Sequence, residues 1–175
     1  ALEVFQFQSE NCNVYKLFLS YLDFKKPTTI EEIPFLPISF FKSHKVITGD
    51  DSYHNVFKSS GTSKLKRSQH FIKDIQLYKH AFLNSYHQFI GNPENQIILA
   101  LLPNYIEQGE SSLVFMTNEL INKTKNSLSG FILNDTKRIL EAYSTSIKQK
   151  KKLVLFGVSY ALMDIAKEKI NLEKA

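Results

Sequence analysis

The chain has 175 residues, of which 43% are hydrophobic, and a formal net charge of +5. This length suffices for a sizeable core, and this composition excludes an intrinsically disordered chain. No run of about 18 apolar residues occurs, so no membrane span is predicted. No secretory signal is visible, and the one cysteine, Cys12, can form no internal disulfide. Both observations favour a reducing, cytoplasmic setting.

Much of the excess positive charge comes from two places, residues 58–67 and the lysines at 148 and 150–152. The lysine run precedes an apolar strand pattern, which is typical of a solvated helix end, where cations suit the helix dipole. The positive balance also suits an anionic ligand such as a nucleotide.

The first third of the chain predicts short elements. Residues 1–8 read as a strand or an irregular arm, and a helix is expected from a cap at Ser9 to near Asp23. Pro34 and Pro37 exclude a regular helix interior and a central strand, so an extended apolar segment is expected there. The elements expected next are a helical turn at 39–44, a strand at 45–47, a turn at 49–52 and a strand at 53–57.

A hydroxyl-rich loop follows, and it is the main candidate for a functional site. It consists of Ser59, Ser60, Gly61, Thr62 and Ser63, with the cations Lys64, Lys66 and Arg67 after it. Backbone N–H groups converge on an anion only where side chains are small, while hydroxyls and cations add donors and charge. The loop is no Walker A or dinucleotide motif, because it lacks a second glycine. The alternative is a plain surface turn.

Strand and helix patterns alternate after the loop. The expected elements are a helix over most of 70–90, a buried strand at 96–102, a helix at 111–124, a strand at 129–133, a helix at 134–148 capped by Asn134 or Asp135, a buried strand at 152–157, and a helix capped by Ser159 that ends near Ile170. This alternation predicts one α/β domain with a largely parallel sheet flanked by helices. The loop at 59–64 and the turns at 103–111 and 157–159 are expected at the carboxyl ends of strands, where such sheets bind ligands.

Four other positions are candidates for the site. His70 is a candidate catalytic residue beside the loop, with a structural role as the alternative. His44 is expected to pack beside the neighbouring phenylalanines. Glu107 and Glu110 could face a ligand cleft at a strand end. Cys12 is expected to be a packed core thiol, and the histidine spacings provide no metal site.

The loop resembles the S-S-G-T-T loop that wraps the phosphates of ATP in adenylate-forming enzymes. Further segments are similar to the acyl-protein synthetase (LuxE-type) branch of that superfamily. They are residues 33–44, Ser68 and His70, residues 100–105 with 111–114, and residues 157–162. The resemblance covers nearly the whole chain, in the same order. Ser63 stands where the family has a second threonine, and Lys64 stands where it has a second glycine.

This resemblance implies a two-step reaction. ATP and a fatty acid give an acyl-adenylate and pyrophosphate, and the acyl group then passes to a thiol of a protein or of coenzyme A. The residues that would hold the β- and γ-phosphates are Ser59, Ser60, Gly61, Thr62 and Ser63, with Lys64 able to place a charge on a phosphate. Lys66 or Arg67 would offset their charge, and Mg²⁺ would bridge phosphate oxygens.

The resemblance further implies that the chain is the N-terminal portion of a longer enzyme, because the ribose-binding and catalytic-lysine segments of the family are not found before Ala175. Full turnover is not expected from it. One alternative is a non-catalytic homologue that binds a nucleotide or a partner, with self-association through exposed apolar surface. A nucleic-acid binder is disfavoured, because no aromatic residues interleave with the loop cations.

Overall fold

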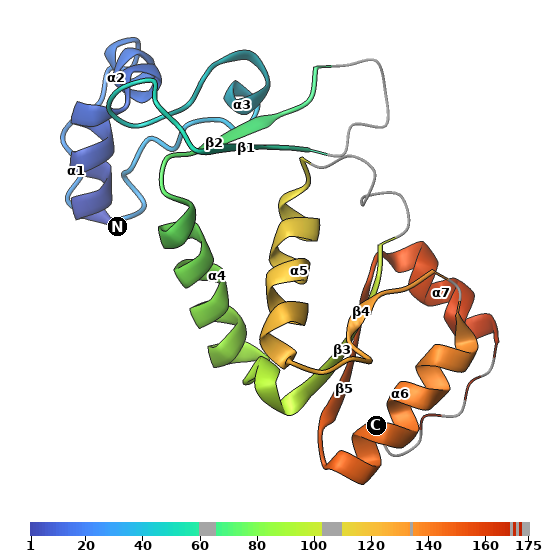
Figure 1. Cartoon of the computed structure of the whole chain (residues 1–175). Coiled ribbons are helices and arrows are strands. Elements are labelled where there is room, and N and C mark those ends of the chain that lie inside the picture. The colour runs from blue at the N-terminus through green and yellow to red at the C-terminus, as the bar shows by residue number, and fades with distance from the viewer. Residues whose placement is uncertain (60–65, 103–109, 134, 169, 171, 173–175) are drawn as a thin grey trace. The chain divides into compact units, whose positions relative to one another are not determined.

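The computed structural model describes residues 1–59, 66–102, 110–133, 135–168, 170 and 172. The chain forms two compact units, Ala1–Ile75 and Gln76–Ala175, and each is described by itself. The fold is mixed α/β, with a two-stranded antiparallel sheet in the first unit and a three-stranded parallel sheet flanked by helices in the second (Figure 1). None of the helices in the described ranges combines the length and the apolar character needed to cross a membrane.

The N-terminal unit begins with two helices, α1 (Leu2–Asn11) and α2 (Asn13–Ser20). The prediction of a strand or arm at residues 1–8 is therefore wrong, since Leu, Glu and Gln in this segment are good helix formers. Cys12 lies between the helices and is buried, as expected of a core thiol. The buried residues around it are Phe5, Tyr15, Leu19 and Ile33. The Tyr15 hydroxyl donates to the Pro34 carbonyl at 2.8 Å, which holds the extended segment on this core.

A short helix, α3 (Phe40–Ser43), is where a helical turn was predicted. The hairpin that follows was not predicted. Strands β1 (Asn55–Lys58) and β2 (Gln69–Ile72) pair antiparallel. The helix predicted over most of 70–90 is present, but it begins only after β2, at Ile75, and ends at Phe89. The strand predicted at 45–47 is wrong, although its Ile47 is buried.

Lys73, directly after β2, fixes the turn at residues 48–52. Its ammonium group donates to the Thr48 carbonyl at 3.0 Å and lies 2.5 Å from an Asp50 carboxylate oxygen. Gly49 has a φ of 73°, a conformation that favours glycine, and its N–H donates to the Asn11 carbonyl at 2.7 Å. These contacts join α1, the turn and the hairpin within the N-terminal unit.

The C-terminal unit alternates helices and strands as the sequence predicts. Its elements are α4 (Ile75–Phe89), η1 (Pro93–Asn95), β3 (Gln96–Leu101), α5 (Ser112–Thr124), β4 (Gly130–Phe131), α6 (Thr136–Gln149), β5 (Lys152–Gly157) and α7 (Ser159–Lys167). The strands are parallel and run in the order β4-β3-β5. The predicted parallel sheet is therefore confirmed, with β3 at its centre.

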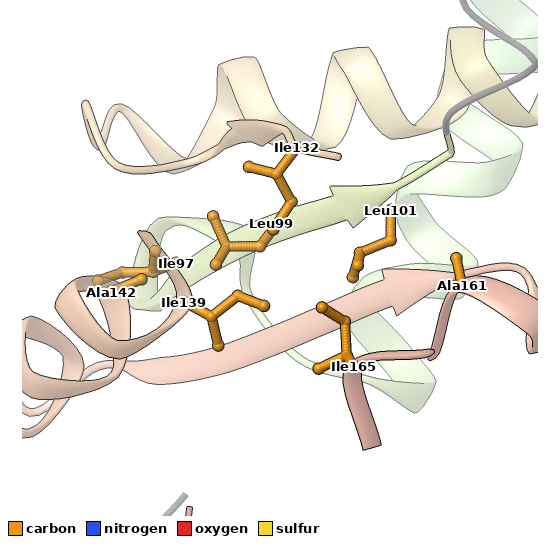
Figure 2. Close-up of a cluster of buried hydrophobic side chains, with 8 residues drawn as sticks. All are labelled: Ile97, Leu99, Leu101, Ile132, Ile139, Ala142, Ala161 and Ile165. Carbon is orange, nitrogen blue, oxygen red and sulfur yellow. The ribbon is translucent and has the colours of Figure 1, made fainter. Parts of the chain in front are cut away.

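Strand β3 is buried on both faces over its whole length. Its side chains Ile97, Leu99 and Leu101 point to one face, where they form a core with residues of α6 and α7 (Figure 2). Those residues are Ile139, Ala142, Ala161 and Ile165. Helix α5 packs on β3 from the opposite face (Figure 1). Each fully buried Leu or Ile contributes about 1.5–3 kcal/mol, so this strand dominates the stability of the unit.

The helix ends of this unit differ in detail from the predictions. Asp135 caps α6 by accepting from the Arg138 N–H at 3.0 Å, while Asn134 lies outside the described residues. Ser159 is the first residue of α7 and not its cap, which is Val158. Phe89, the last residue of α4, is 77% exposed. The lysine run lies at the end of α6, as predicted, and Lys150 adopts a left-handed conformation there.

The close approach of β5 to β3 gives a test of the sheet. A Cβ added to Gly157 would lie 2.9 Å from Leu101 Cβ and 3.0 Å from the Leu101 carbonyl oxygen. We expect Gly157→Ala to lower the free energy of unfolding by about 1–3 kcal/mol, because backbone atoms cannot move aside cheaply. Chemical denaturation followed by circular dichroism measures this change.

Gly130→Ala is the matched control, since its Cβ would meet only the end of the Arg138 side chain, at 2.9 Å. We expect it to stay within about 1 kcal/mol of the parent. Equal costs for the two substitutions would contradict the tight β3–β5 contact.

The ion pair of Lys73 with Asp50 gives a second test. This contact and hydrogen bonds from Ser52 hold the pKa of Asp50 well below its usual range. The stabilisation is therefore present above the unfolded-state pKa of about 3.9 and is lost as pH falls. We expect Asp50→Asn to destabilise the N-terminal unit at neutral pH, with a cost that shrinks steadily as the solution is acidified below that pKa.

Hydrogen exchange of the β1 and β2 amides, measured as a function of pH, follows this unit alone. Asp51→Asn serves as the control, because Asp51 is 84% exposed and lies 3.5 Å from Lys45. A cost of Asp50→Asn that does not change with pH would contradict the assignment.

Candidate functional site

The end of the hairpin positions the start of the hydroxyl-rich loop. The Ser59 N–H donates to the Ser68 carbonyl at 3.0 Å, and the Ser68 N–H donates to the Ser59 hydroxyl at 3.0 Å. This pair continues the β1–β2 register, in which Lys58 lies opposite Gln69. The loop thus joins two antiparallel strands and does not lead from a strand into a helix. The strand before the loop therefore belongs to the antiparallel hairpin of the N-terminal unit and is not a strand of the parallel sheet.

Arg67 donates hydrogen bonds to backbone carbonyls of the hairpin. Its Nε donates to the Ser59 carbonyl at 2.5 Å, and a terminal nitrogen donates to the Lys58 carbonyl at 3.4 Å. Two of the guanidinium nitrogens of Arg67 therefore already donate to carbonyls of the chain. The side chain of Lys66, by contrast, is exposed to solvent. The remaining residues predicted to hold phosphate lie outside the described residues; they are Ser60, Gly61, Thr62, Ser63 and Lys64.

The two candidate histidines occupy different settings. His70 lies on β2 opposite Phe57, and its ring meets Phe41 edge-on with the centroids 6.2 Å apart. The residue reaches the surface, yet partial burial of the ring lowers the pKa of His70 and favours the neutral imidazole. His44 stacks on Phe40 at 4.8 Å, so its predicted packing role is confirmed.

The carboxyl edge of the parallel sheet is a second candidate site. From β3 the chain crosses through α5 to β4, and from β4 it crosses through α6 to β5, on the other side of β3. The two crossovers place α5 and α6 on opposite faces of the sheet (Figure 1). Such a reversal creates a topological switch point between the carboxyl ends of β3 and β5, where open α/β sheets bind their ligands.

The switch point is lined by backbone groups and a helix N-terminus. Leu101 pairs with Gly157, and the Val158 N–H lies 3.4 Å from the Leu101 carbonyl. Ser159 is exposed at the start of α7, which no described side chain caps, whereas Ser111 caps α5. The first turn of a helix presents N–H groups without intrahelical acceptors, which suit an anion. The expected position of the turn at 157–159, at the carboxyl end of a strand, is therefore confirmed.

The two acidic candidates follow β3 in the sequence. Glu110 is partly buried just before the α5 cap, and Glu107 lies outside the described residues. Within the described residues, no three His, Cys, Asp or Glu side chains gather as a metal site would require.

The sequence analysis missed the hairpin and with it the role of Lys73. The sequence carries only part of the signal: residues 55–58 and 69–72 each contain two adjacent apolar residues, and they flank a Ser-rich segment that contains Gly61. The alternation of apolar and polar residues that would indicate a hairpin is missing from both runs. The aromatic residues at 71, 78 and 82 masked the hairpin, because their spacing also fits a helix face.

Comparisons of the chain with models of protein families, with curated proteins and with solved structures each give no match.

Proposed function

We propose that the chain is the ATP-phosphate-binding portion of an enzyme that activates a carboxylic acid, such as a fatty acid, as its adenylate and transfers the acyl group to a thiol. This follows from the resemblance to acyl-protein synthetases described above. The buried, unpaired thiol of Cys12 fits the reducing cytoplasm as the setting.

One observation carries the proposal. Two of the segments that resemble the family, residues 100–105 and 157–162, are far apart in the sequence, and their first residues adjoin at the carboxyl ends of β3 and β5. Ala100 pairs with Phe156, and Leu101 with Gly157. Segments selected by sequence pattern alone thus coincide with the switch point, where the topology of the sheet favours ligand binding. A chance resemblance gives no reason for that coincidence.

The loop of the hairpin would hold the β- and γ-phosphates through its backbone N–H groups and hydroxyls. Lys66 would supply the balancing charge, because it is exposed while Arg67 donates to carbonyls of the hairpin. Bound ATP supplies the electrophilic α-phosphorus that the carboxylate attacks. The work of the chain in that step is positioning and charge stabilisation, and it needs no protein nucleophile.

Binding of MgATP to the loop is testable by thermal unfolding. We expect millimolar MgATP to raise the melting temperature of the chain, because a ligand that binds the folded state stabilises it by mass action. The double variant Ser60→Ala/Thr62→Ala removes two hydroxyl donors, and we expect it to lose most of the shift. The single variant Lys66→Gln should also reduce the rise in melting temperature, because it removes one positive charge near the bound phosphates.

The matched control is Ser39→Ala/Thr29→Ala, which removes two exposed hydroxyls of the same unit that are remote from the loop in sequence. It should keep the full shift. Absence of any shift at millimolar MgATP, or equal losses in both double variants, would overturn the proposal that the loop binds phosphate.

A further inference from the structure

Lysine side chains gather at the amino end of the parallel sheet, opposite the switch point. They come from the last turn and the end of α5, the end of α6 and the start of β5 (Figure 1). The six are Lys123, Lys125, Lys148, Lys150, Lys151 and Lys152. We call this surface the basic end and define it by residues 89–95, 121–127 and 146–152. Glu94 is the one acidic residue in these ranges.

Contacts with Glu94 hold the segments of the basic end together. The Lys125 ammonium group lies 3.0 Å from the Glu94 carboxylate, and the Lys151 ammonium group donates to the Glu94 carbonyl at 2.9 Å. Lys125 lowers the pKa of Glu94, with smaller contributions from Lys123 and Lys151. The Asn126 amide donates to the Gln149 side chain at 3.2 Å, which links the ends of α5 and α6. Three of the six lysines, Lys123, Lys125 and Lys151, therefore act on the one carboxylate in these ranges.

Large apolar side chains are exposed in the same ranges. Phe89 is 77% exposed, Ile90 48% and Ile147 47%. The end of α4 that carries the first two is joined to the start of β3, because the Tyr86 hydroxyl donates to the Gln96 side chain at 2.6 Å. Gln96 in turn lies opposite Lys152 in the β3–β5 pairing. The basic end thus combines strong positive charge with exposed apolar groups.

We propose that the basic end docks on an anionic lipid bilayer. Its lysines attract the negative headgroup surface, and Phe89, Ile90 and Ile147 enter the boundary between headgroups and acyl chains. The long apolar stems of lysine let the ammonium groups reach headgroups while the neighbouring side chains insert. This inference does not depend on the proposed function, since it uses the opposite end of the sheet.

The composition of the surface favours a bilayer over an acidic protein or a nucleic acid. All six cations are lysines, whereas protein interfaces are enriched in arginine and depleted in lysine. Arginine also suits the bidentate contacts that nucleic-acid phosphates accept. Single-stranded nucleic acids need several stacking aromatic rings, and Phe89 is the one aromatic residue in the defining ranges. A surface of dispersed lysines with exposed apolar side chains therefore suits an anionic bilayer better than an acidic protein or a nucleic acid.

Sedimentation of the full chain with lipid vesicles tests the proposal. We expect binding to vesicles that contain about a third phosphatidylserine and little binding to pure phosphatidylcholine. Raising the salt from about 0.1 M to about 0.5 M should release most of the bound protein. The variant Lys123→Gln/Lys148→Gln/Lys150→Gln/Lys152→Gln leaves both Glu94 contacts in place, and its partition coefficient should fall on the order of 100-fold or more.

The matched control is Lys16→Gln/Lys25→Gln/Lys26→Gln/Lys42→Gln, which changes the net charge equally on exposed lysines of the other unit. It should bind nearly as the parent does. Phe89→Ser/Ile147→Ser changes no charge, and we expect it to weaken vesicle binding about 10-fold through the lost apolar burial.

Three outcomes overturn the proposal: equal binding to neutral and anionic vesicles, equal losses in the two lysine variants, or binding to an acidic peptide or duplex DNA without binding to anionic vesicles.

Discussion

The pairing of β3 with β5 is the contact on which the C-terminal unit depends. It runs from Gln96 opposite Lys152 to Leu101 opposite Gly157, and it places a fully buried strand between helices on both faces. The side chains of β3 supply the core shared by α6 and α7 (Figure 2). Because β5 joins β3 on the side away from β4, the same pairing creates the switch point. Stability and the position of the candidate site therefore follow from one strand pair.

The parallel sheet was predictable because its signals are strong and local. Continuous apolar runs at 96–102 and 152–157 are typical of the strands of a parallel sheet, and helical spacing between them indicates crossovers. The predicted burial is confirmed for β3 but not for β5, which is only half-buried. The hairpin was not predictable in the same way. Antiparallel pairing of β1 with β2 depends on contacts across the chain, while Phe71, Tyr78 and Phe82 fit a helix equally well by spacing. Helix α4 keeps only the last two of these.

The candidate site, too, was predictable where it depends on the parallel sheet and not where it depends on the hairpin. The sequence located the turn after β5, because turns at the ends of buried strands have fixed places in this topology. It could not assign Arg67, whose role depends on the carbonyls of Lys58 and Ser59 that the hairpin brings within reach. The phosphate-binding role of the loop and the reading of the chain as one domain of a longer enzyme stay predictions. Both depend on the resemblance to acyl-protein synthetases.

The two ends of the parallel sheet differ chemically for a physical reason. Helices after parallel strands begin at the carboxyl edge, so their N–H groups and caps gather there and favour anions of small size. The same helices end at the opposite edge, where lysines complement the helix dipoles. Complementing the helix dipoles requires only a few cations, and these would lie in the last turns of α5 and α6. It explains Lys123 and Lys148, but not the further lysines at the start of β5 or the exposure of Phe89 and Ile147. That surplus of charge and apolar surface is what distinguishes a docking surface from a solvated helix end.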